Sequence, residues 1–136
     1  MAYDVAWCKA VRMIARHLFP DGFDVSSDAP NTYLDLAVHV ARTGRYCVSS
    51  GGTDDPAFDT AETWQAFRAW HDWCHIQGGH GFDLLGECTT VRLQGAMVAS
   101  LYGQRGLIRW RPILRRQIIA YNFGPEAFCQ TTFTGV

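Results

Sequence analysis

The segment TAETWQAFRAWHDWCHIQ, residues 60–77, decides the fold because its large side chains recur at helical spacing. At about 100° per residue, five of these side chains gather within a sector about 120° wide. They are Trp64, Phe67, His71, Cys74 and His75. Asp59 or Thr60 can cap the start of this helix, and Gly78-Gly79 ends it. The pattern predicts a helix whose buried face carries two histidines.

Upstream, similar apolar spacing predicts a helix from about Tyr3 to Leu18, followed by a loop over residues 20–31. The buried stripe of this first helix is expected to hold Trp7, Cys8, Val11, Ile14, Ala15 and Leu18. The stretch Thr32–Ala41 alternates like a strand but also suits a helix, and Gly44 stands where a helix end favours glycine. We therefore expect a helix there, with an extended segment near 45–50.

Downstream, Asp83 can cap a fourth helix that runs to about Tyr102. Pro112 suits the first turn of a fifth helix, which Gly124-Pro125 would close. The sequence thus predicts an all-α fold, an irregular bundle of about five helices in a single domain of residues 1–136.

The composition excludes several classes of protein. Apolar residues make up 48% of the chain, which rules out disorder, and no apolar run is long enough to span a membrane. The five cysteines include no C-x-x-C pair and follow no secretory signal, so we expect reduced thiols and a cytoplasmic protein. A net charge of −1 argues against a general nucleic-acid or membrane binder.

Basic residues are concentrated in one segment near the C-terminal end. Five arginines fall within twelve residues: Arg105, Arg109, Arg111, Arg115 and Arg116. Two interpretations stay open, a solvated helix face whose arginine stems cover aromatic side chains, and a basic surface that binds a partner.

The fourth predicted helix places a carboxylate on an apolar stripe. That stripe holds Leu84, Glu87, Val91, Gln94, Val98 and Leu101. Burying Glu87 is costly unless it is paired or bound to a metal. A short connection should make the third and fourth helices antiparallel neighbours, which brings the end of one beside the start of the other. His71, His75 and Glu87 are therefore predicted to bind one divalent transition metal, zinc in the first instance, with coordination positions left open.

Other residues can complete or replace this metal site. His80 is a candidate extra ligand, whereas hydrogen bonds between the histidines and Glu87 would form a polar core without any metal. The order His71-Asp72-Trp73-Cys74-His75 looks like the zincin signature H-E-x-x-H with Asp in place of Glu. Asp72 is therefore predicted to act as a catalytic base or as an acceptor that orients a ligand histidine. Gln94, Gln117 and Tyr121 are expected to hydrogen-bond around the ligands.

The motif F-R-A-W-H-D, residues 67–72, followed by His75 and by Gly86-Glu87, resembles small uncharacterised proteins encoded by bacteriophages and prophages. The resemblance covers roughly residues 40–130. It implies a phage accessory protein that acts inside an infected bacterium, and it supplies no mechanism.

Three functions compete at this point. The first is a small metal-dependent hydrolase, which an open pocket at the histidines would favour. The second is a non-enzymatic, anti-CRISPR-like inhibitor that binds a host defence or replication protein, which a closed site would favour. In that case the arginine segment, with Trp70 and Trp73 if they are exposed, would contact the host protein. The third is a nucleic-acid binder, which the net charge disfavours.

Overall fold

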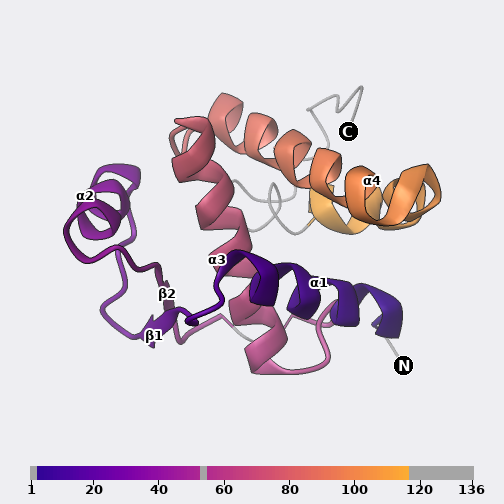
Figure 1. The fold of residues 1–136 in the computed structure, drawn as a ribbon, viewed down its shortest axis with the longest axis horizontal. Helices are drawn as coiled ribbons and strands as arrows, with labels where there is room; N and C mark the ends of the chain where they lie inside the picture. Colours follow the sequence, from indigo (N-terminus) through magenta and orange to yellow (C-terminus); the bar gives the residue numbers. More distant parts are fainter. Residues whose placement is uncertain (1–2, 53–54, 117–136) are drawn as a thin grey trace. The chain divides into compact units, whose positions relative to one another are not determined.

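The computed structural model describes residues 3–52 and 55–116, which form four helices and two short strands (Figure 1). In order they are α1 (Val5–Leu18), β1 (Asp24–Ser26), α2 (Tyr33–Thr43), β2 (Cys47–Ser49), α3 (Ala61–Gly78) and α4 (Leu84–Arg115). The prediction of a mainly helical fold is confirmed, although these residues hold four helices where five were expected across the whole chain.

The chain divides into two compact units, residues 1–73 and 74–136. The boundary lies inside α3, so this helix belongs to the first unit up to Trp73 and to the second from Cys74 on. The prediction of a single domain over residues 1–136 stays a prediction. Within the described residues, no helix is both long and apolar enough to cross a lipid bilayer.

An aromatic cluster forms the core of the first unit. The ring of Trp7 on α1 lies 5.8 Å from that of Phe67 and 6.4 Å from that of Trp70, and Phe58 lies 5.3 Å from Phe67. Asp4 caps α1 by accepting hydrogen bonds from the backbone amides of Ala6 and Trp7. The predicted stripe of α1 is confirmed except at its last member, since Leu18 is only half-buried.

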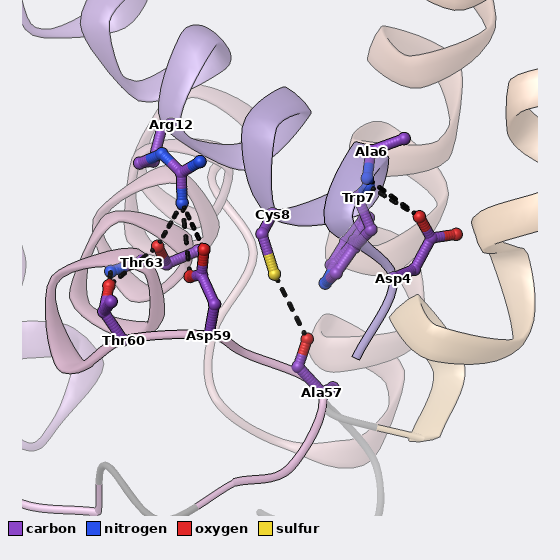
Figure 2. A network of polar contacts seen from close by, with 9 residues as sticks. All are labelled: Asp4, Ala6, Trp7, Cys8, Arg12, Ala57, Asp59, Thr60 and Thr63. Atoms are coloured by element: carbon purple, nitrogen blue, oxygen red, sulfur yellow. Dashed lines mark hydrogen bonds and ion pairs between the residues drawn. The ribbon is translucent and has the colours of Figure 1, made fainter. Parts of the chain in front are cut away.

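A polar network joins α1 to the start of α3 (Figure 2). Arg12 donates to Asp59 at 2.9 Å and to the hydroxyl of Thr63 at 2.8 Å. The hydroxyl of Thr60 accepts from the backbone amide of Thr63 at 3.2 Å, which makes Thr60 the cap of α3. Of the two residues predicted for this cap, Thr60 takes the role and Asp59 pairs with Arg12.

A two-stranded parallel sheet lies next to α2. β1 pairs with β2 so that Val25 is opposite Val48. β1 corrects the prediction of an irregular loop over residues 20–31: three residues among turn formers are too few to show a strand pattern, and β1 forms because β2 offers it a partner. The helix prediction for the ambiguous stretch is confirmed by α2, which ends at Gly44 with φ of 69°. The extended segment near 45–50 is confirmed by β2.

The second unit contains the end of α3 and the long helix α4. Asp83 caps α4 as predicted, accepting from the amide of Gly86 at 2.8 Å. The backbone leaves helical geometry at Gly103, with φ of 76° and ψ of 178°, directly after the predicted end at Tyr102. The prediction that Pro112 begins a fifth helix is wrong, because the segment is already helical before it. Burial of Trp110 and Leu114 one turn apart stabilises this segment despite the proline.

Candidate metal centre

The structure brings His71, His75 and Glu87 together. The two histidines lie one turn apart on α3, and Glu87 lies in the first turn of α4. Their side chains are 1%, 0% and 2% exposed. One ligand atom of each residue lies within 4.8 Å of the others. This buried group can hold a metal ion, as the sequence predicted.

Glycines let the chain turn tightly between the two helices. Gly79 has φ of 68°, a conformation that other residues rarely adopt, and it follows the last residue of α3. At Gly86 a Cβ atom would overlap the backbone carbonyl of Gly81. Any larger residue at position 86 would therefore push the loop away from the helix start that carries Glu87.

The hydrogen bonds of His75 define which ring nitrogen can bind a metal. Its Nδ1 lies 2.7 Å from the backbone carbonyl oxygen of His80 and 3.2 Å from the hydroxyl of Thr90. A carbonyl only accepts, so Nδ1 carries a proton and donates it. In the neutral ring Nε2 then presents its lone pair, the arrangement typical of metal-binding histidines.

That lone pair points towards a carboxylate. Nε2 of His75 lies 3.3 Å from Oε2 of Glu87. A lone pair and a carboxylate repel each other at this distance unless a proton or a metal ion lies between them. Zinc at about 2.0–2.1 Å from each ligand in a tetrahedral site would hold its ligand atoms about 3.3–3.4 Å apart. The 3.3 Å separation of His75 and Glu87 fits that geometry, and it also fits a proton shared by the two atoms. What favours a metal ion is His71, which brings a third ligand atom within 4.8 Å of the other two, whereas a shared proton needs only the pair.

Apolar side chains surround the two histidines. The ring of Phe82 meets His75 edge-on at 4.6 Å, and Phe67 stacks on His71 at 6.4 Å. Val91 is fully buried on the same face of α4 as Glu87. Low polarity strengthens every electrostatic interaction in the group, and it also raises the cost of leaving a charge unbalanced.

Asp72 is buried, with 6% of its surface exposed. The pKa of the Cys47 thiol on β2 is raised by burial first, and then by the negative charges of Asp24 and Asp72. Asp72 is not a member of the metal-binding group among the described residues. Its predicted role as base or orienting acceptor stays a prediction.

The remaining residues predicted around the site have mixed outcomes. Gln94 is fully buried on the same face of α4 as Glu87, while Gln117 and Tyr121 lie outside the described residues. His80 contributes its backbone carbonyl, and its ring is not in the metal-binding group. Cys74 is buried against Met97, and burial raises the pKa of its thiol to about 12.

The residues predicted to contact a partner or to form the apolar stripe of α4 differ in their exposure. Trp70 is fully buried, so it offers no surface to a partner, while Trp73 is half-buried. On α4 the predicted burial of the two end residues of the apolar stripe is wrong, since Leu84 is 40% and Leu101 is 56% exposed. The arginine segment is largely on the surface, with Arg105, Arg109 and Arg116 exposed and Arg111 and Arg115 half-buried.

Sequence reasoning missed the residues that orient the site. Thr90 lies three positions after Glu87 and shares its helix face, which is the signal that could have identified it. The carbonyl of His80 carries no signal in a sequence, because every residue has one. A hollow of about 970 Å³ beside α2, lined among others by Asp28, Asp35, His39 and Arg42, was not predicted either.

No protein-family model matches this chain, and neither the curated proteins nor the solved structures contain a significant match to it.

Proposed function

We propose that this is a binding protein whose His71, His75 and Glu87 hold one zinc ion that stabilises the fold. The burial of the three ligand side chains, none more than 2% exposed, carries this proposal. Catalysis requires substrate and water to reach the ion, whereas a structural ion works best when it is shielded from both.

The donor set supports zinc in preference to other common ions. Two imidazole nitrogens and one carboxylate oxygen suit zinc, whereas calcium and magnesium prefer oxygen ligands. The proton on Nδ1 of His75, fixed by the His80 carbonyl, holds the ring in the tautomer that a metal needs. The ion would join the end of α3 to the start of α4 and would balance the buried charge of Glu87.

Elemental analysis of tag-free protein tests this proposal. We expect close to one equivalent of zinc in the wild type and less than a tenth of that in His71→Ala and Glu87→Ala. His80→Ala is the matched control and should keep its zinc, because His80 contacts His75 through its backbone carbonyl, which the variant retains, and its ring is not a member of the metal-binding group. Wild-type protein that is free of metal after purification with added zinc would overturn the proposal and leave a polar core of two histidines and a carboxylate.

A second candidate, a zinc-dependent hydrolase, is favoured by the ligand count. Three protein ligands with one open coordination position are typical of catalytic zinc, whereas structural sites usually have four. In that case Asp72 would be the candidate base. Cobalt-substituted protein separates the two candidates. A change in its visible absorption on adding azide would show a reachable coordination position and favour the hydrolase, and an unchanged spectrum would favour the closed site.

The cellular setting is also a proposal. The resemblance of the F-R-A-W-H-D and Gly86-Glu87 motifs to phage proteins supports action in the cytoplasm of an infected bacterium, with a host protein as partner. Co-purification would test whether a host protein is the partner. Tagged protein would be isolated from infected and uninfected cells, with the Arg105→Glu/Arg109→Glu variant for comparison. An identical set of bound proteins for wild type and variant would count against it.

A further inference from the structure

The helical segment after the Gly103 kink carries an uneven distribution of charge. Residues 104–116 contain five arginines and no acidic residue. The second unit as a whole, residues 74–136, holds six arginines and three acidic residues, whereas residues 1–73 hold ten acidic and six basic residues. Although the net charge of the whole chain is near zero, the second unit is therefore basic, and most of its positive charge lies on one helix.

Helical spacing places these arginines around an apolar centre. At about 100° per residue, Arg105, Arg109 and Arg116 fall on one side of Ile108 and Pro112, and Arg111 and Arg115 fall on the other. Ile108 is 64% exposed and Pro112 is exposed. Trp110 and Leu114, 5% and 0% exposed, lie on the opposite face, where the ring of Trp110 meets that of Tyr102 edge-on. We call the surface formed by the five arginines with Ile108 and Pro112 the arginine face.

We propose that the arginine face binds another protein through a surface that has acidic side chains around an apolar recess. This inference rests on the proposed binding role and does not depend on the metal. Protein interfaces commonly combine an apolar centre with a polar rim, and arginine is enriched in them. Charge complementarity requires the rim of the partner to be acidic.

The same features argue against a nucleic acid as the partner. Proteins that bind single strands stack bases on exposed aromatic rings. The one aromatic residue after the kink in the described helix, Trp110, is buried and meets Tyr102 edge-on at 5.3 Å. An exposed isoleucine at the centre of the basic surface would face phosphates, which gives it no favourable contact.

Fluorescence anisotropy with three labelled probes tests the proposal. The first probe is an 18-residue helical peptide with leucines on one face and glutamates on both sides of them. The second has the same composition scrambled so that the leucines no longer share a face, and the third is a 20-nucleotide single-stranded DNA. We expect the first peptide to bind roughly tenfold more tightly than the second, because only it offers an apolar centre.

Variants assign the binding to particular residues. Ile108→Glu should abolish the difference between the two peptides, and Arg105→Gln/Arg109→Gln should weaken both and reduce the salt dependence of binding. Arg92→Gln, an exposed arginine elsewhere on α4, is the control and should change nothing. Thermal melting and zinc content should match the wild type in all of these variants, so failure of this inference is distinguishable from failure of the metal proposal.

Four outcomes would overturn the inference. Tighter binding of the DNA would make the face a nucleic-acid surface, and equal binding of the two peptides would reduce it to non-specific charge attraction. No saturable peptide binding would leave a solvated helix face. Sedimentation showing a dimer that Ile108→Glu dissociates would make a second copy of this chain the occupant.

Discussion

Two polar clusters in this protein join helices, and they balance their charges in different ways. In the first unit, Arg12 on α1 pairs with Asp59 before α3 at 2.9 Å (Figure 2), and both side chains are partly exposed, at 36% and 20%. In the other cluster, His75 and Glu87 lie 3.3 Å apart and are almost completely buried. Arginine carries its charge at every physiological pH, so the first pair is complete by itself. The second needs a proton or a metal ion, which is why it is the candidate site.

The largest expected effect separates these two ways of balancing charge. Removing one partner of a buried charged group typically costs about 3–5 kcal/mol, because the other partner stays buried. We expect Glu87→Ala to lose that much stability in chemical denaturation, together with the zinc. Glu87→Gln sharpens the result, since an amide can still hydrogen-bond to His75. If zinc is the stabilising partner, Glu87→Gln should also lose most of the zinc, and its stability should fall nearly as far as that of Glu87→Ala.

A glutamine variant that keeps wild-type stability and contains no metal would assign the cluster to a polar core. The control is chelation of the wild type. Zinc at about 100 times its dissociation constant contributes about 2.7 kcal/mol, so removing it should lower Tm by roughly 10 °C. An unchanged Tm after chelation would show that no ion contributes to stability.

The second prediction concerns the backbone that positions Glu87. Gly86→Ala places a methyl group against the Gly81 carbonyl, so the loop or the helix start must shift. We expect a loss of roughly 2–3 kcal/mol, within the range for overpacking a tight site, and weaker zinc binding. Gly81→Ala is the matched control, because a Cβ there meets nothing within 4 Å. Equal zinc affinity in the two variants would show that the close approach at Gly86 does not shape the site.

Sequence reasoning identified the members of the metal group because each lies on a periodic stripe. The spacing of His71, His75 and Glu87 could be read directly from the sequence. The short turn between their helices indicated that the end of the first helix lies beside the start of the second. The contacts that orient them could not be read, since the carbonyl of His80 belongs to the backbone and its direction depends on the turn. β1 and the helical residues before Pro112 were missed for a related reason: a partner strand and the burial of Trp110 outweigh the local sequence preference there.

The third prediction tests how strongly water is excluded from the region around His75 and Glu87, with the buried Cys74 thiol as the probe. Burial raises the pKa of the Cys74 thiol from 9.0 to about 12. Above pH 9 the unfolded chain therefore loses this proton while the folded chain keeps it, so stability falls as pH rises, by at most about 1.4 kcal/mol per pH unit. Cys74→Ala should remove this component of the decline between pH 9 and 11. An identical slope in wild type and variant, measured by urea unfolding, would show that Cys74 ionises as easily folded as unfolded.

The smallest expected effect comes from the first cluster. The pKa of Asp59 is lowered overall: burial raises it, but hydrogen bonds from Thr63 and Arg12 and the charge of Arg12 lower it by more. A carboxyl whose pKa is depressed in the folded state adds stability above its unfolded pKa and loses that contribution as pH falls through the folded value. Because the pair is partly exposed, Arg12→Gln should cost only about 1 kcal/mol at pH 7, and its cost should shrink below about pH 3.8. Chelators should change the stability of this variant as much as that of the wild type. A cost that is independent of pH would mean that Arg12 stabilises α1 through its stem packing and not through its charge.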